Sequence, residues 1–257
     1  MIIDSHTHIG SGGLIKISAP QLVKSMEKAG VDKAFVFAGK INNSPTEKLL
    51  IETKKYKGKL YPVGSVSPLS ANRAKLAQVE RWLKNKEIFG LKFYPGYEFF
   101  YPDDAVLRPY LELLVKYNRP AIFHSGDTYN KAGGAKLKYA HPLHIDDLAV
   151  RLPELKIVIA HFGYPWTIDA AEVVYKNKNV YADCSGFVYG KFKKEDSECF
   201  KKMFRDFLER SGSATKILFG TDWPISDQSS YVFLVKKISG RDRYDIMYKN
   251  AMRIYGI

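Results

Sequence analysis

The chain begins Met1-Ile2-Ile3-Asp4-Ser5-His6-Thr7-His8, an apolar start followed by polar residues that can bind metal. Read as a strand, this stretch places Ile2, Asp4, His6 and His8 on one face, because successive side chains alternate between the two faces. Two histidines on one face can bind a single metal ion, and imidazole suits zinc and similar cations. The stretch alone leaves two interpretations open, a metal site at the end of the first strand or a pair of surface histidines, and the positions of the other histidines and of one aspartate decide between them.

Short apolar runs and amphipathic helical segments alternate along the rest of the chain. The first helix is predicted from a capping box at Ser18 and Gln21 to a stop at Gly30. Further strands are expected at 31–39, 60–68, 88–95, 121–126, 156–163, 179–186 and 216–224. Further helices are expected at 44–58, 71–86, 103–117, 143–152, 167–177 and 195–211, with two more after residue 224.

About eight strand–helix units in series, with continuously apolar strands, predict a parallel sheet covered by helices. At 257 residues the best fit is a (β/α)8 TIM-like barrel, a single domain spanning residues 1–257. The alternative is an open doubly wound sheet, but no G-x-G-x-x-G motif follows the first strand.

The composition narrows the class of protein. The chain is 46% hydrophobic without any apolar stretch near the ~20 residues of a membrane span, so we expect a soluble cytoplasmic protein with no membrane partner. Cys184 and Cys199 form no C-x-x-C pair, which favours reduced thiols. The net charge of +13 favours a small anionic substrate over nucleic acid, because the lysines lie mostly on predicted helices.

Four of the six histidines and one aspartate fall where predicted strands end. In a barrel, catalytic groups lie at the carboxyl ends of the strands. We therefore expect these residues to converge on one mouth of the barrel: His6, His8, His124, His161 and Asp222. The other two histidines, His141 and His144, flank a proline before a helix and are expected to cap that helix or lie on the surface.

These residues lie in motifs that resemble the amidohydrolase superfamily, most closely the branch called amidohydrolase family 2, which includes decarboxylases of aminocarboxymuconate semialdehyde and resorcylate. The similarity runs from the first residue to the last. The matching motifs are Asp4-x-His6-x-His8, His124-Ser125-Gly126, Pro153-x-Leu155 continuing to His161-x-Gly163, Phe219-Gly220-Thr221-Asp222-x-Pro224, and Asn250-Ala251-x-Arg253 with Gly256.

The resemblance implies one divalent metal ion, most often zinc, with manganese or another divalent ion as alternatives. Its ligands would be His6, His8, His124 and Asp222, and His161 would stand beside it. Such an ion lowers the pKa of a bound water toward ~7. Asp222 would then accept the proton of the water, and His161 would polarise a substrate oxygen.

Lys92 and Tyr94, at the end of the predicted fourth strand, are expected to contact the substrate. Lys92 keeps three interpretations: it binds a substrate carboxylate, it is carboxylated and bridges two metal ions as in some amidohydrolases, or it is a structural ammonium. Asp183 and Ser185 follow the seventh strand, where the sequence does not fix which way they face. Asp4 is expected to face inward and support the metal ligands.

Several functions are compatible with these motifs. We favour a metal-dependent hydrolase acting on a C–N, C–O or lactone bond. A nonoxidative decarboxylase using the same metal site is the alternative, since the branch contains both. A nuclease of the TatD type also begins with H-x-H, but has a carboxylate where this chain has Lys92. A barrel without catalysis is the remaining hypothesis, and a homodimer stays open as the assembly.

Overall fold

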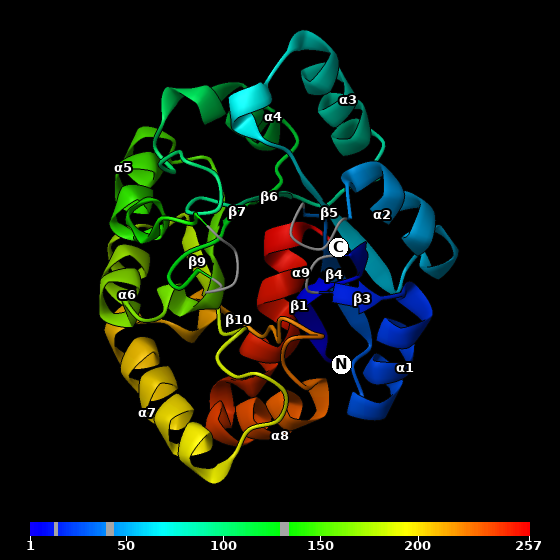
Figure 1. Ribbon diagram of the computed structural model, residues 1–257. Helices are drawn as coiled ribbons and strands as arrows, with labels where there is room; N and C mark the ends of the chain where they lie inside the picture. Colours follow the sequence, from blue (N-terminus) through cyan, green and yellow to red (C-terminus); the bar gives the residue numbers. More distant parts are fainter. Residues whose placement is uncertain (13–14, 40–43, 129–133) are drawn as a thin grey trace.

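The computed structural model describes residues 1–12, 15–39, 44–128 and 134–257. Eight parallel strands form one sheet at the centre of the molecule, with helices around them (Figure 1). In spatial order the strands are β1 (Ile3–His8), β4 (Lys33–Phe37), β5 (Leu60–Ser65), β6 (Leu91–Phe93), β7 (Ala121–Phe123), β8 (Ile157–Ile159), β9 (Val180–Asp183) and β10 (Ile217–Leu218). Two short antiparallel strands that the sequence analysis did not predict follow β1, β2 (Gly10–Gly12) and β3 (Ile15–Ile17).

The ring of strands closes between β1 and the segment that follows β10. The Ser5 N–H donates to the Phe219 carbonyl at 2.9 Å, and the Asp222 N–H donates to the His6 carbonyl at 2.8 Å. The His8 N–H donates to the Trp223 carbonyl at 2.7 Å. The fold class predicted from the sequence, a (β/α)8 barrel, is therefore confirmed.

The helices follow the strands in the predicted alternation. They are α1 (Ala19–Ala29), α2 (Thr46–Thr53), α3 (Arg73–Lys84), α4 (Arg108–Lys116), α5 (Leu143–Arg151), α6 (Thr167–Lys176), α7 (Lys194–Ser211), α8 (Gln228–Ile238) and α9 (Asn250–Tyr255). The predicted ends of α1 are confirmed: the Ser18 N–H donates to Oε1 of Gln21 at 2.9 Å, and Gly30 stops the helix with φ +70°. Over the described ranges, no helix has both the length and the apolar character that crossing a bilayer requires.

The inside of the barrel is apolar at the amino-terminal end of the strands. Phe35, Ile122, Val158 and Leu218 pack there against α9, whose Tyr255 ring stacks on Phe35 at 3.7 Å between centroids. This plug excludes water from the amino-terminal end of the strands, so the polar side chains collect at the opposite, carboxyl end.

The alternation predicted for residues 2–8 is wrong at its start. Ile3 packs inside the barrel, whereas Ile2 packs in the layer between strands and helices. The pairing of β1 with β4 shifts register between Asp4 and Thr7. An irregularity of this kind changes which face the following residues occupy, and it brings His6 and His8 to the inner face, where both rings contact Phe37.

The motif near the carboxyl terminus holds the last strand in place. The side-chain amide of Asn250 donates to the carbonyls of Ala214 at 2.8 Å and Ile217 at 2.7 Å, and Arg253 donates to the carbonyl of Thr215 at 2.6 Å. These bonds tie α9 to the segment that enters β10, which carries Asp222 four residues beyond its end.

Replacing Asn250 by alanine is expected to lower the free energy of unfolding by about 1–3 kcal/mol, because two buried carbonyls lose their donor. The urea midpoint at unchanged m-value measures this loss. Asn250→Asp keeps the shape and removes both donors, so it should be at least as damaging. Wild-type midpoints for both variants would show that this contact does not stabilise the barrel.

Candidate metal centre

His6, His8 and Asp222 meet at the carboxyl end of the barrel, on β1 and on the segment that follows β10. Nε2 of His8 lies 3.1 Å from Oδ1 of Asp222, and Nε2 of His6 lies 3.7 Å from the same oxygen. Each of the three side chains offers one possible ligand atom, and these three atoms all lie within 4.8 Å of one another. They come from β1 and from the segment after β10, which the barrel closure brings side by side.

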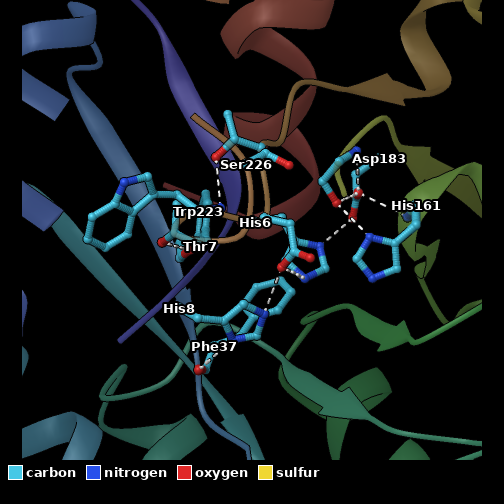
Figure 2. Close-up of polar contacts among 12 residues, drawn as sticks. His6, Thr7, His8, Phe37, His161, Asp183, Trp223 and Ser226 are labelled. Carbon is cyan, nitrogen blue, oxygen red and sulfur yellow. Dashed lines mark hydrogen bonds and ion pairs between the residues drawn. The ribbon is translucent and has the colours of Figure 1, made fainter. Parts of the chain in front are cut away.

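The contacts around these two histidines place Nδ1 against an acceptor and turn Nε2 toward Asp222. Nδ1 of His6 lies 2.9 Å from Oδ2 of Asp183, and Nδ1 of His8 lies 3.3 Å from the carbonyl of Phe37 (Figure 2). Because both neighbours are acceptors, the proton of each neutral ring belongs on Nδ1. This pattern, with a carboxylate or carbonyl behind each ring, is the one that metal-binding histidines show.

The buried polar atoms of the cluster fit a divalent ion. Nε2 of His6 and Oδ1 of Asp222 are both buried without a hydrogen-bond partner. Ligands about 2.1 Å from a tetrahedral zinc ion lie about 3.4 Å apart. The observed spacings of 3.1 and 3.7 Å bracket that distance, so the residues present fit such an ion.

A low pKa favours the neutral form of a histidine, which is the form that binds metal, and three histidines of this region have lowered pKa values. Burial, and then the neighbouring Lys92 ammonium, lowers the pKa of His6 well below its usual value. The same two causes lower the pKa of His124 to about 3. Burial also lowers the pKa of His161 well below its usual value.

His124 lies beside this cluster, just after β7. Its Nε2 lies 2.7 Å from the carbonyl of Asp127, so Nδ1 is the nitrogen left for a ligand. The His124 ring lies 5.2 Å from that of His161, between centroids. In the described part of the chain, His124 is not part of the group of ligand atoms that includes His6, His8 and Asp222. Its role as a metal ligand therefore stays a prediction.

Asp183 connects His6 to His161, a role that the sequence could not assign. Its Oδ1 accepts the N–H groups of His161 and Ser185, both at 3.1 Å, and the hydroxyl of Ser185 in a very short bond. Its Oδ2 faces His6. His6, His161 and Asp183 also lie close enough to hold an ion, but both oxygens of Asp183 are already hydrogen-bonded, so we interpret this group as a support for the ligands.

The same network fixes the tautomer of His161. Ser185 donates its hydroxyl proton to Asp183, so the nitrogen Nδ1 of His161, 2.9 Å from Oγ of Ser185, must donate in turn. The other nitrogen, Nε2, then carries a lone pair. The polarising role expected for His161 would need a proton on Nε2. Because that nitrogen carries a lone pair, the hydrogen bonds favour His161 as a proton acceptor instead.

Two residues of the centre have backbone conformations that non-glycine residues rarely adopt. His161 has φ +60° and Asp222 has φ +64°. Such strain, of order 1–3 kcal/mol for each residue, persists where the surroundings impose it and is concentrated at functional sites. Neither residue could be identified as strained from the sequence.

Lys92 lies in β6, and Tyr94 directly follows that strand, next to the cluster. The Lys92 side chain is 1% exposed, and its Nζ is buried without a hydrogen-bond partner. Burial lowers its pKa to about 8, against the opposing attraction of Asp183 and Asp222. The Tyr94 hydroxyl donates to the Ala38 carbonyl at 2.7 Å, so its proton is already used and only its oxygen can accept a further bond.

Gly186, after β9, makes room for the centre. A Cβ added there would lie 2.7 Å from Nδ1 of His161 and 3.2 Å from Oδ2 of Asp222. Gly190, with a similar φ of +72°, has nothing within 4 Å of such an atom.

Gly186→Ala is therefore expected to weaken zinc binding by about 10–100-fold, the size of effect seen when groups supporting ligands are displaced. Gly190→Ala carries the same backbone strain without the clash, and should bind zinc as the wild type does. Competition with a chelating dye measures both affinities. Equal affinities for the two variants would mean that the close approach to His161 and Asp222 has no effect.

The sequence matches the family described as amidohydrolase over residues 3–257. No curated protein sequence gives a significant match.

Three solved structures share the fold along essentially the whole chain. A probable 2-pyrone-4,6-dicarboxylic acid hydrolase from Acinetobacter baumannii, with citric acid bound, has TM-score 0.73 at 16% identity, covering 100% of this chain and 99% of the other. An amidohydrolase from Burkholderia multivorans with bound zinc has TM-score 0.76 at 15% identity, with the same coverage. A 2,6-dihydroxybenzoate decarboxylase from Rhizobium has TM-score 0.71 at 18% identity, covering 99% and 98%. At these identities the likeness shows the fold.

Proposed function

The chain belongs to the amidohydrolase family, and on that premise we propose that it is a metal-dependent hydrolase of a C–N, C–O or lactone bond in a small carboxylate-bearing substrate. The observation that carries the proposal is the buried cluster of His6, His8 and Asp222 in the barrel mouth, where Nε2 of His6 and Oδ1 of Asp222 have no hydrogen-bond partner. As a family, these enzymes are hydrolases or decarboxylases, so the class of bond is the part that is proposed.

We assign His6, His8, His124 and Asp222 to a single divalent ion, and we propose zinc because the Burkholderia relative binds zinc. When bound, such an ion supplies a Lewis acid that activates water and polarises a substrate oxygen at neutral pH. The alternative of two metal ions bridged by carboxylated Lys92 is not favoured, because the Asp183 oxygens are already hydrogen-bonded to His6, His161 and Ser185.

Asp222 and His161 provide the proton transfers of hydrolysis. Each offers a proton acceptor: a carboxylate oxygen of Asp222 and the unprotonated Nε2 of His161. In the proposed reaction, the oxygen of water bonds to the acyl carbon while Asp222 accepts its proton. The bond from that carbon to nitrogen or oxygen then breaks, and the proton passes to the leaving atom. His161 can accept and return a proton in the same way.

The charges around the centre support a carboxylate substrate. The carboxylates of Asp183 and Asp222 balance a divalent ion and leave the ammonium of Lys92 without a counter-charge. A buried unpaired cation is unfavourable, and a substrate carboxylate next to Nζ would remove that cost. The Acinetobacter relative, which carries citric acid, and the Rhizobium decarboxylase both act on or hold carboxylic acids by their names.

Lys92→Met is expected to lower kcat/KM for a carboxylate substrate by about 10–100-fold, the value of a charge-assisted hydrogen bond. Most of the loss should be in KM. The corresponding methyl ester, which has no charge for Lys92 to pair with, should be turned over equally by both proteins. Equal losses on acid and ester would assign Lys92 a structural role, and two metal ions per wild-type chain would assign it to a bridge.

The decarboxylase alternative keeps support from the Rhizobium relative, whose fold matches as well as that of the hydrolase. A direct test uses the zinc-loaded protein with 2-pyrone-4,6-dicarboxylate and with 2,6-dihydroxybenzoate. The proposal expects ring opening of the lactone, seen as loss of pyrone absorbance, without CO2 release. Release of CO2 as the main product from either compound would replace hydrolysis by decarboxylation.

A further inference from the structure

A cavity of about 750 Å³ lies on the outer wall of the barrel, between α2 and α3. Its floor consists of Leu60, Tyr61 and Pro62 at the start of β5, with Phe89 just before β6. Residues that precede these two strands, such as Gly58 and Glu87, also line it. The cavity is therefore near the amino-terminal end of the strands, opposite the mouth that holds His6 and Asp222.

One face of each helix is left without a helical partner at this groove. The α2 face contains Glu47, Leu50 and Ile51, and Lys54 follows directly after the helix. The α3 face contains Gln78, Arg81 and Trp82, and Asn85 follows directly after that helix. Both sets follow the spacing of one side of a helix. Over the described residues, α3 packs on α4 and α2 packs on β5, while the two helices do not pack closely on each other.

The groove is apolar inside. Trp82 and Leu60 are almost fully buried in its wall and floor, whereas Ile51 is 76% exposed at its edge. A large exposed aliphatic side chain beside an apolar floor is unfavourable in water, and covering both with an apolar ligand would be favourable.

The rim of the groove is basic. Its cations are Lys54, Lys57, Arg81 and Lys86, against the two carboxylates of Glu47 and Glu87. Within the described part of the chain, none of these four cations forms an ion pair. The rim therefore has a surplus of positive charge available to an anion.

We propose that this groove is a second ligand site, which binds an amphiphilic anion. An apolar chain or flat ring lies on the floor against Trp82 and Ile51, and one anionic head group lies among the rim cations. The volume is within the range of small-molecule pockets, ~300–1,000 Å³. Because the groove and the metal centre are at opposite ends of the strands, this ligand is distinct from the proposed substrate.

The test is a calorimetric titration of the intact protein with dodecanoate below its micelle concentration. The proposal expects one binding site per chain and a change in tryptophan fluorescence, since Trp82 lines the groove. Dodecyltrimethylammonium has the same chain with the opposite charge and should bind much more weakly. Equal binding of both amphiphiles, or no binding of dodecanoate, would overturn the proposal.

Two surface variants locate the site. Ile51→Asp should weaken dodecanoate binding at least about tenfold, because it places a carboxylate against the chain. Lys54→Glu with Lys57→Glu should weaken it about tenfold at low salt. The matched controls on α8, Phe233→Asp and Lys236→Glu with Lys237→Glu, change similarly exposed residues and should bind as the wild type does.

Two further results separate this site from the other occupants. His6→Ala should retain dodecanoate binding; loss of binding there would place the ligand in the barrel mouth and overturn the proposal. Sedimentation velocity of Ile51→Asp should match the wild type. A wild-type dimer that dissociates in this variant would show that a second copy covers the groove instead.

Discussion

His6→Ala is expected to purify with almost no bound metal, whereas the wild type carries about one divalent ion per chain. His6 provides an unpaired buried nitrogen 3.7 Å from Oδ1 of Asp222, and its ring is held from behind by Asp183. Without that nitrogen, only weaker coordination by the remaining ligands is left. Because a Lewis acid contributes several kcal/mol to such reactions, the activity should fall by at least about 1,000-fold.

Elemental analysis of protein prepared without added metal measures the first effect. His144→Ala is the matched control, since this histidine lies outside the centre, beside Asp103 and Tyr101. It should keep both the ion and the activity. Equal metal content in His6→Ala and wild type would contradict the proposed metal centre and the hydrolytic mechanism that depends on it.

Asp183→Asn is expected to weaken zinc binding by about 10–100-fold while the fold is retained, the range seen for groups that orient metal ligands. Asp183 accepts on both oxygens, from His6 on one side and from His161 and Ser185 on the other. An amide has only one oxygen. If that oxygen stays with His161 and Ser185, the amide N–H points at Nδ1 of His6 and moves the ring proton to Nε2, where it blocks the ligand lone pair.

Zinc affinity and thermal stability measured together separate this effect from simple damage. Asp183→Ala removes all acceptors and should lose both affinity and stability, whereas Asp183→Asn should lose mainly affinity. Tight zinc binding in Asp183→Asn would show that the tautomer of His6 does not depend on this carboxylate.

Much of the fold could be predicted because its signals are local. The capping box at Ser18 and the stop at Gly30 depend on residues within one helix, and the apolar runs of the strands are continuous. The strands are shorter than predicted: β6 covers only Leu91–Phe93, whereas the apolar run predicted a strand over 88–95, because an apolar run does not show where the ladder of hydrogen bonds ends. The β2 and β3 pair was missed, since Gly10–Gly12 has no side-chain pattern to recognise.

The site was predictable in its residue types and less so in its contacts. His6, His8 and Asp222 could be placed together because strand ends converge in a barrel. The supporting aspartate could not: Asp4 was expected to face inward, but it precedes the register shift in β1 and accepts hydrogen bonds from Thr221 and Gln228, and Asp183 supports the ligands instead. The bond from Tyr94 to Ala38 joins two strands, and no local pattern encodes it.

The closure of the barrel sets the order in which the protein can mature. Ser5 bonds to Phe219 across 214 positions of the chain, and the same junction holds His6 and His8 beside Asp222. During synthesis the two histidines emerge before Asp222 and must wait for the long segment between them. Joining such distant segments costs loop-closure entropy and slows folding, so the binding energy of an ion acts as a late cross-link between the two ends.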